Sequence, residues 1–391
     1  MRKFNVTGVC VPTKDYMVDI SGKLEQIMKL IADGCYFTIN RARQYGKTTT
    51  LSMIQATLPS EYICMRISFQ GVDEESFETG EAFCKMFLNL TYDALKSGSI
   101  DKEYKDKWLD PTVIDFLLLS RHISKMCENR KVVLIVDEVD QTSHNRVFIR
   151  FLGMLREKFL KRREDRDNTF HSVIFAGVYD IKDIKIKLID EGKYTLAEGE
   201  TKIYNSPWNI AVNFNVAMSF SPSEIVTMLV EYEKDHNTGM NIAKIAEAIY
   251  DYTSGYPFMV SRVCQCIDEE LGKDWTVGGI QKAVQHMLDE KSTLFNDVIK
   301  NLENNKDLHD YIYDMLILGD YKAYSIYNPI VSTGDRYGFL KKAANGSAKV
   351  VISNKIFELL MTDYFLSYGE SVHRPSPYGY SDRLRPSAIY S

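Results

Sequence analysis

The sequence predicts an α/β protein in which helices sandwich a parallel sheet, followed by an all-helical unit and a unit with a hairpin. Three observations predict this. Short apolar runs alternate with longer helical stretches through the first half, as in parallel sheets buried on both faces. Ser221-Pro222-Ser223-Glu224 has the residues of a helix start. Two extended runs flank the turn sequence Asn345-Gly346.

The sheet is predicted from short apolar runs between residues 35 and 214. Five runs are typical of strands, the last more weakly than the others: Cys35–Ile39, Tyr62–Phe69, Lys131–Val136, His171–Val178 and Ile210–Phe214. Four stretches between them have helical patterns: Lys47–Leu58, Glu75–Lys96, Val113–Asn129 and Arg146–Lys161. Because strands and helices alternate, we expect a parallel sheet with helices on both faces.

Two further units are expected after this sheet, which takes residues 1–215. Helices at about 222–234, 241–252 and 257–271 predict a small helical unit at 216–274. The next unit, at 275–367, joins helical patterns to the hairpin and indicates a winged-helix-like domain. Its expected elements are Val277–Leu288, Lys306–Leu318, Tyr337–Leu340, Lys349–Ser353 and Asn354–Leu366. The stretch 368–391, rich in Ser, Pro, Tyr and Arg, is expected to be a flexible tail.

Composition narrows the class of protein. Of the 391 residues, 45% are hydrophobic and 26% charged, as in ordinary globular proteins, and the net charge is −5. This acidity makes nucleic acid a less favoured partner than protein. Seven cysteines without a CxxC motif are typical of a reducing cytoplasm. The longest aliphatic run, Val132–Val136, is far below the roughly 20 residues of a membrane span, so we expect a cytoplasmic protein with no membrane partner.

The first motif with recognisable chemistry is Gly46-Lys47-Thr48. It lies between the expected strand Cys35–Ile39 and the helix that begins near Lys47, which is the strand–loop–helix order of a P-loop. In such a loop, backbone N–H groups and the helix dipole bind phosphates. Lys47 would reach the β- and γ-phosphates, and the Thr48 hydroxyl would ligate Mg²⁺. The motif therefore predicts a site for a nucleoside triphosphate with Mg²⁺.

The segment expected to bind the phosphates departs from the usual pattern at its first position. Its members are Arg41, Arg43, Gln44, Tyr45, Gly46, Lys47, Thr48 and Thr49. The pattern G-x-x-x-x-G-K-[ST] has glycine where this sequence has Arg41. A surface turn that happens to contain Gly-Lys-Thr is the alternative interpretation of this segment.

A second motif favours the phosphate site over that alternative. The apolar run that begins at Lys131 ends in Asp137-Glu138, 90 residues after Lys47. In P-loop enzymes, an aspartate at a strand end holds Mg²⁺. Glu138 is then placed to polarise an attacking water. A strand followed by an acidic loop would explain this run alone, but not both motifs at consistent positions.

These residues resemble a known family. The run Tyr36–Thr50 closely resembles the AAA-ATPase-like family of bacterial P-loop proteins, whose members often carry arginine where Arg41 stands. Other segments are similar as well: Thr7–Pro12, Tyr16–Asp19, Ile67–Gly71, Asp137–Asp140, Ala176–Asp180, Gly255–Pro257 and Val351–Glu358. The resemblance spans roughly residues 3 to 367. It implies an ATPase core of the AAA/STAND kind, a helical lid and a winged-helix unit.

The resemblance also implies roles for residues outside the two motifs. Asp180 would be a sensor near the γ-phosphate, although a strand-end turn explains it equally well. Pro257 would contact the base, although proline is also common at a helix start. Arg262 would act as a second sensor that reaches the phosphates, although a solvated or ion-paired arginine is the alternative interpretation. Tyr16 would shield the base.

Many relatives continue into a nuclease-like domain of the PD-(D/E)XK type. After Ser367 the sequence holds only Glu370 and Asp382 as acids, too few for the metal site of such a domain. We therefore expect no nuclease activity.

Three functions are compatible with these motifs. The first is a Mg²⁺-dependent ATPase that acts as a nucleotide-driven conformational switch. The second is a non-hydrolysing nucleotide-binding scaffold whose winged-helix unit binds DNA or a partner protein. The third, a kinase-like phosphoryl transferase, is disfavoured because the Asp137-Glu138 pair suits activation of water. Besides ATP, a partner protein or a second copy of the chain is expected, while the choice of ATP over GTP stays open.

Overall fold

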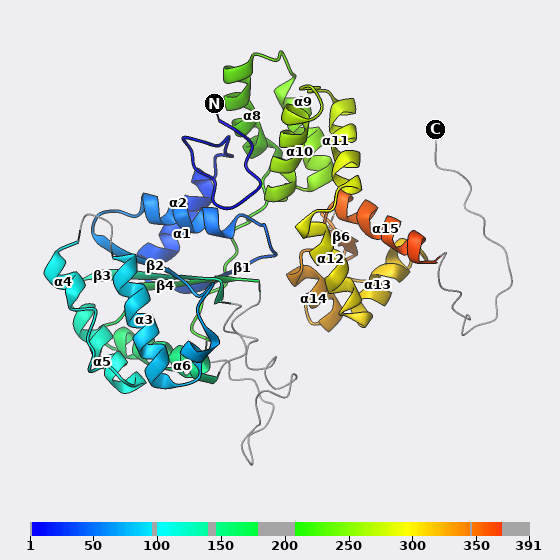
Figure 1. Cartoon of the computed structure of the whole chain (residues 1–391). Coiled ribbons are helices and arrows are strands. Elements are labelled where there is room, and N and C mark those ends of the chain that lie inside the picture. The colour runs from blue at the N-terminus through cyan, green and yellow to red at the C-terminus, as the bar shows by residue number, and fades with distance from the viewer. Residues whose placement is uncertain (1, 96–99, 140–145, 179–207, 345, 370–391) are drawn as a thin grey trace, which may run out of the picture.

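The computed structural model describes residues 2–95, 100–139, 146–178, 208–344 and 346–369. Its centre is a sheet of four parallel strands in the order β1-β4-β3-β2. The strands are β1 (Tyr36–Asn40), β2 (Tyr62–Ser68), β3 (Lys131–Asp137) and β4 (Ser172–Gly177). The predicted α/β fold with a parallel sheet is therefore confirmed (Figure 1).

The fifth expected strand, Ile210–Phe214, is present only as a single bridge beside β1. Val212 pairs in parallel with Phe37, and the Val212 N–H donates to the Tyr36 carbonyl at 2.9 Å. One pairing does not make a strand, so that prediction was wrong for the segment as a whole. The segment nevertheless lies beside β1, at the edge of the sheet.

Alternate residues of each strand face two different hydrophobic cores. On β3, Val133 and Ile135 belong to one core, and Val132, Leu134 and Val136 belong to the other. Because both faces are covered, the strand is apolar without the polar–apolar alternation of a half-exposed strand. Helices α1 (Ser21–Ala32) and α2 (Lys47–Thr57) contribute to the first core; α3 (Gly80–Ala94), α5 (Phe116–Met126) and α6 (Arg146–Arg163) contribute to the second.

One helical prediction in this core unit needs correction. The stretch Glu75–Lys96 is not one helix, because it divides into the 3₁₀ turn η1 (Glu74–Phe77) and α3. The break falls at Thr79, whose side chain accepts a hydrogen bond from the Ala82 N–H and so caps α3. Two helices were not predicted in this unit, α1 and the short α4 (Lys102–Asp106).

The helical unit contains α8 (Pro222–His236), α9 (Ile242–Thr253), α10 (Pro257–Glu269) and α11 (Val277–Asp289). The predicted capping box is present at its start: Ser221 Oγ accepts from the Glu224 N–H at 3.2 Å, and Glu224 Oε2 accepts from the Ser221 N–H at 2.7 Å. Helix α11 packs against α9 and α10. We therefore describe α11 with the helical unit, although it also packs against α15; the boundary at residue 274 stays a prediction.

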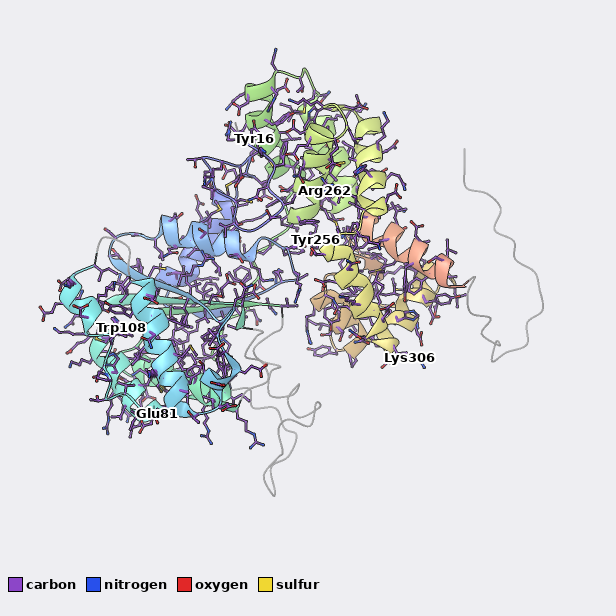
Figure 2. The ribbon with its side chains drawn as sticks, viewed as in Figure 1. Tyr16, Glu81, Trp108, Tyr256, Arg262 and Lys306 are labelled. Carbon is purple, nitrogen blue, oxygen red and sulfur yellow. The ribbon has the colours of Figure 1, made fainter. Side chains whose placement is uncertain are left out.

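The N-terminal segment lies against this helical unit, although the sequence placed it with the sheet. The Phe4 ring lies 5.1 Å from the rings of Tyr16 and Tyr232, and Arg2 forms an ion pair with Asp235 at 2.9 Å. Figure 2 shows Tyr16 beside α8. The first residues of the chain thus join the core unit to the helical unit.

The third unit contains α12 (Thr293–Glu303), α13 (Lys306–Leu316), α14 (Pro329–Arg336) and α15 (Lys355–Gly369), with the antiparallel strands β5 (Leu340–Lys342) and β6 (Val350–Ile352). Helices α12 and α14 were not predicted. The expected hairpin is present; Asn345 of its turn lies outside the described residues, and Gly346 has a φ of +73°. Helices followed by a hairpin and a closing helix are the order expected of a winged helix, and that assignment stays a prediction. No helix in the described part of the chain is long and apolar enough to cross a membrane.

Candidate nucleotide-binding site

The P-loop lies between β1 and α2, as the sequence predicts. Gly46 precedes the first residue of α2 with a φ of +76°, and Gln44 also has a positive φ, 55°. Glycine adopts this left-handed backbone without strain, which explains its place at the end of the loop. No side chain caps the start of α2. The helix start can therefore offer its backbone N–H groups and its positive dipole end to a phosphate.

Lys47 is buried and turned back onto its own loop. Its Nζ donates to the carbonyl oxygens of Arg41 at 2.9 Å and of Ala42 at 3.0 Å. These contacts hold the ammonium across the opening of the loop. A β- or γ-phosphate at the start of α2 would take up the same charge, as in other P-loops.

The end of β3 is tied to the start of α2 through an arginine that the sequence analysis missed. Arg66 of β2 lies opposite Ile135, and its guanidinium is 3.4 Å from Asp137 Oδ2. The same Nη2 donates to the Thr48 carbonyl at 3.2 Å. A lone arginine in the apolar run of β2 was a signal that could have identified it, because a half-buried guanidinium needs an anionic partner.

Asp137 is the last residue of β3, and Glu138, which follows it, lines the larger cavity beside the P-loop. Asp137 is only 4% exposed, and its Oδ1 accepts from the Glu138 N–H at 3.0 Å. Glu138 has a positive φ of 55°, so the chain turns sharply after the strand. The Thr48 hydroxyl and the Asp137 carboxylate offer the oxygen ligands that Mg²⁺ prefers, so these residues fit the ion that the motif predicts.

Two cavities flank the P-loop. The larger cavity, about 730 Å³, is lined by the loop itself, by Glu138 and by third-unit residues such as Asp297 and Asn301. The smaller cavity, about 400 Å³, lies between the N-terminal segment, the loop and α10, and includes Tyr16 and Phe258. Both are lined by the loop residues Gln44, Tyr45, Gly46 and Thr49. A nucleotide along the loop could therefore place its base in the smaller, mainly apolar cavity and its phosphates in the larger one.

The residues expected from the resemblance have different positions. Pro257 lines the smaller cavity, and a Cβ on Gly46 would lie 3.8 Å from its ring. Tyr16 lines the same cavity, and its hydroxyl donates to Asp235 at 2.8 Å. Arg262 lines neither cavity; its guanidinium is 2.6 Å from both Glu270 and Glu290. A sensor role would require Arg262 to leave two carboxylates. Asp180 lies outside the described residues.

The remaining loop residues connect the P-loop to other units. Arg41 lines neither cavity, because its guanidinium turns away and donates to the Asn40 and Val216 carbonyls. Arg43 forms an ion pair with Asp297 of α12 at 3.1 Å, and Gln44 Nε2 donates to Thr293 at 3.4 Å.

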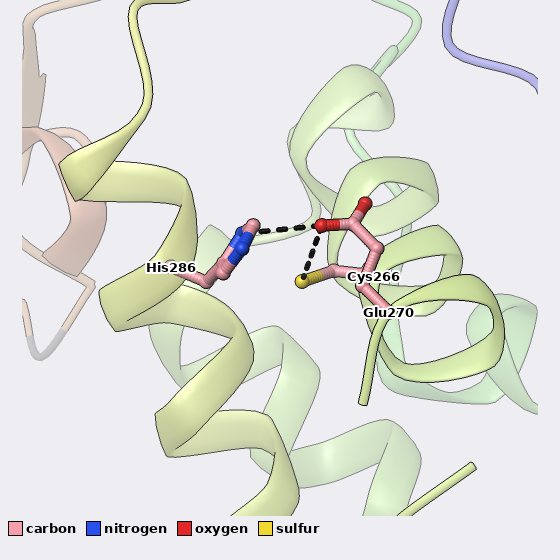
Figure 3. A group of neighbouring side chains, drawn as sticks. All are labelled: Cys266, Glu270 and His286. Atoms are coloured by element: carbon pink, nitrogen blue, oxygen red, sulfur yellow. Dashed lines mark hydrogen bonds and ion pairs between the residues drawn. The ribbon is translucent and has the colours of Figure 1, made fainter. Parts of the chain in front are cut away.

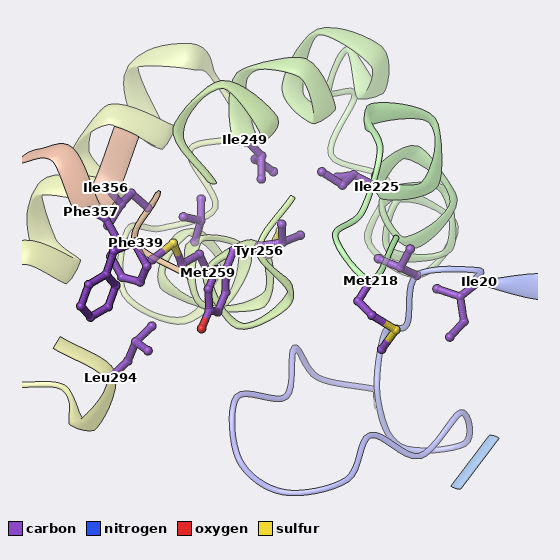
Figure 4. Packing of buried hydrophobic residues seen from close by; sticks show 14 of the residues in the cluster. Ile20, Met218, Ile225, Ile249, Tyr256, Met259, Leu294, Phe339, Ile356 and Phe357 are labelled. Carbon is purple, nitrogen blue, oxygen red and sulfur yellow. The ribbon is translucent and has the colours of Figure 1, made fainter. Parts of the chain in front are cut away.

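Tyr256 links the P-loop to both later units. Its hydroxyl donates to the Arg43 carbonyl, and its ring lies 4.5 Å from Tyr45 and 5.7 Å from Phe357 of α15. Figure 2 shows it where the helical unit meets the third unit, and Figure 4 shows it among buried side chains of both. These contacts between the loop and the later units were not predicted.

A parallel sheet with a P-loop after β1 and an acidic pair after β3 defines the P-loop nucleotide-binding class. Within that class, the model of the AAA-like domain matches residues 13–316. The chain therefore belongs to the family of AAA-like ATPases, as its sequence resemblance indicated. No curated protein matches the chain.

Solved structures agree with this class at the level of the fold. A Walker-type ATPase of Pyrococcus abyssi superposes with a TM-score of 0.60 and 12% sequence identity, over 92% of this chain and 99% of that one. An ORC2 protein of Aeropyrum pernix with ADPNP and ADP gives 0.43 at 12% identity, covering 90% of this chain and 94% of its own. At 12% identity a likeness shows the fold alone, and of these two only the first has a TM-score high enough to support it.

Proposed function

We propose that this chain binds ATP with Mg²⁺ and hydrolyses it slowly, and that the bound nucleotide controls the position of the third unit. The observation that carries the catalytic part is the link from Asp137 through Arg66 to Thr48, which joins the acidic pair to the helix start that carries Lys47. Glu138 lines the same cavity as Lys47 and Thr48. Three of the proposed groups therefore line one cavity, and Asp137 lies next to Glu138 in the chain.

Each residue has a distinct part in the proposed reaction. The N–H groups at the start of α2 and the ammonium of Lys47 bind the phosphates and offset their charge. Thr48 and Asp137 would hold Mg²⁺, which, when bound, withdraws charge from the phosphate oxygens. Glu138 accepts a hydrogen bond from a water and orients it for attack on the γ-phosphorus. The smaller cavity excludes solvent from the base.

The switch is supported by the contacts between the P-loop and the third unit. The Arg43–Asp297 ion pair and the Gln44–Thr293 hydrogen bond place α12 beside the larger cavity. Gly338 also approaches the loop closely, since a Cβ there would lie 3.0 Å from the Ala42 Cβ. Phosphates in the larger cavity would share this space with α12. Their arrival or loss is therefore expected to shift the third unit relative to the loop.

The test measures nucleotide binding and turnover separately. We expect Lys47→Ala to abolish ATP binding, and Glu138→Gln to retain binding while it stops hydrolysis. Lys131→Ala and Glu61→Gln are matched controls. These two residues form an ion pair with each other at the amino ends of β3 and β2, whereas Asp137 lies at the carboxyl end of β3. Both controls should leave binding and turnover unchanged.

Turnover that survives Lys47→Ala would overturn the site assignment. Tight binding by the wild-type chain without turnover would favour the nucleotide-binding scaffold. Competition between ATP and GTP in the same binding assay determines the base preference.

A further inference from the structure

A cluster of side chains outside the nucleotide site joins α10 to α11. Cys266 of α10 lies four residues before Glu270, which follows the helix, and His286 of α11 lies four residues before Glu290, which follows that helix. Residues at this spacing share one face of a helix. The Cys266 sulfur, a Glu270 oxygen and a His286 ring nitrogen lie within 4.8 Å of one another, as Figure 3 shows.

The two carboxylates each have one oxygen directed toward this cluster. Arg262 takes the other oxygens: its guanidinium is 2.6 Å from Glu270 Oε1 and 2.6 Å from Glu290 Oε2. His286 Nδ1 is 3.2 Å from Glu270 Oε2 and 3.5 Å from Glu290 Oε1. The guanidinium thus holds both carboxylates from behind, as hydrogen-bond partners of metal ligands do.

We propose that Cys266, Glu270, His286 and Glu290 form a binding site for a zinc-class divalent cation. A thiolate, an imidazole nitrogen and carboxylate oxygens are the ligands that zinc takes, usually four in a tetrahedron. An ion-pair network alone would account for Arg262 and the two glutamates, with Cys266 as part of the hydrophobic core, and the metal titration distinguishes the two interpretations. No single run of sequence marks these ligands, because they come from two facing helices.

The charges and distances suit this ion. A thiolate and two carboxylates carry three negative charges, and Arg262 with a divalent cation carries three positive ones. Bonds of about 2.0–2.3 Å in a tetrahedron place ligand atoms about 3.3–3.7 Å apart. The atoms of Cys266, Glu270 and His286, which lie within 4.8 Å of one another, would therefore close by about 1 Å, and Glu290 would enter from its position 3.5 Å from His286 Nδ1. The Cys266 thiol would release its proton as the metal–sulfur bond forms.

The site would fix the angle between two helices that lead to the P-loop. Helix α10 begins beside the loop at Tyr256 and Pro257, and α11 continues into α12, which carries Thr293 and Asp297. A metal bound between α10 and α11 would therefore stabilise the junction of the helical unit and the third unit. Binding of this metal does not depend on whether the chain hydrolyses ATP.

The experiment uses the full chain after treatment with a chelator and removal of the chelator. Titration with Co²⁺ should produce the thiolate-to-cobalt charge-transfer absorption, and added Zn²⁺ should abolish it. Dialysis against Zn²⁺ should leave a single equivalent bound and raise the melting temperature. Cobalt held by Thr48 and Asp137 would have no sulfur ligand, so the absorption distinguishes the two sites.

Variants identify the ligands. His286→Ala and Cys266→Ala should each remove the charge-transfer absorption, whereas the matched control Cys264→Ala, in the same helix, should retain it. His286 is partly exposed, so its variant decides the question even if Cys266→Ala does not fold. The proposal is overturned if the wild-type chain shows no such absorption, or if His286→Ala retains it.

Discussion

Replacing Arg66 by methionine tests whether this arginine stands in for a cation beside Asp137. Asp137 and Arg66 have side chains 6% and 19% exposed, and their charged atoms are 3.4 Å apart. At an effective dielectric constant of about 20, two unit charges at that distance attract by about 5 kcal/mol. Part of this attraction offsets the free energy that it costs to remove the guanidinium from water, and the methionine variant does not have that cost. We therefore expect Arg66→Met to lower the free energy of unfolding by about 2–4 kcal/mol.

Mg²⁺ makes this prediction specific to the site. A divalent cation at Thr48 and Asp137 supplies the positive charge that the variant lacks, so Mg²⁺ with nucleotide should stabilise Arg66→Met more than the wild-type chain. Thermal unfolding with and without Mg²⁺-nucleotide measures the difference. For a unit of about 200 residues, the loss without ligand corresponds to a fall of roughly 4–16 °C in melting temperature.

A control and a refuting result complete this test. Arg163→Met removes an exposed arginine and should change the free energy of unfolding by less than about 0.5 kcal/mol. If Arg66→Met loses the same stability with and without Mg²⁺-nucleotide, Arg66 does not share its partner with the metal. The reasoning would then be wrong even though the ion pair exists.

Two further predictions concern the helical unit and the second core. Gly255 has a φ of +73°, and a Cβ there would lie 1.8 Å from the Phe220 carbonyl oxygen, so Gly255→Ala should lower the free energy of unfolding, measured by chemical denaturation, by about 2–5 kcal/mol. The control Gly272→Ala, at a φ of +62° with nothing within 4 Å, should lower it by only about 1–2 kcal/mol. Equal losses in the two variants would contradict the overlap with Phe220. Burial opposes ionisation of Asp167, but hydrogen bonds from the buried Lys158 and from Ser124 outweigh it and lower the pKa of Asp167 below 3.8. The stabilisation from a lowered pKa is fully present above the unfolded-state pKa of about 3.9 and is lost as pH falls through the folded-state pKa. The stability difference between wild type and Asp167→Asn, about 3–5 kcal/mol at neutral pH, should therefore shrink as the pH falls below about 3.9. A difference that does not change with pH would refute the pairing.

The sequence predicts the sheet well because burial on both faces leaves a simple pattern. The β3 run Val132–Val136 is fully buried, and such runs between helical stretches have few other interpretations. Helix α1 escaped prediction because Ile20 precedes it, where no side chain caps the helix. Helix α14 had a start signal in Asn328-Pro329, with the Asn328 side chain accepting from two backbone N–H groups. Asparagine before proline also marks turns, so that signal was ambiguous.

The two motifs of the site were predictable, and the contacts between units were not. Lys47 and Asp137 are recognised from short local patterns whose spacing is set by the strands between them. Arg43 and Asp297 are 254 residues apart, and neither belongs to a pattern. Whether such residues meet depends on how three units pack, which local sequence does not encode. The same holds for the Cys266–His286 cluster, because its ligands come from two helices that are paired only in the folded chain.

Arg41 shows how a departure from a motif can be explained once the structure is known. The Arg41 N–H donates to the Gly177 carbonyl of β4 at 3.1 Å, which a glycine could also do, so the difference lies in the side chain. Its guanidinium lies over the Phe214 ring at 5.6 Å and donates to the Val216 carbonyl at 3.1 Å, in the segment that leads to α8. The arginine therefore fastens the start of the P-loop to the connection between the core and helical units. A movement of one unit relative to the other would therefore shift the start of the P-loop, as the proposed nucleotide-controlled switch requires.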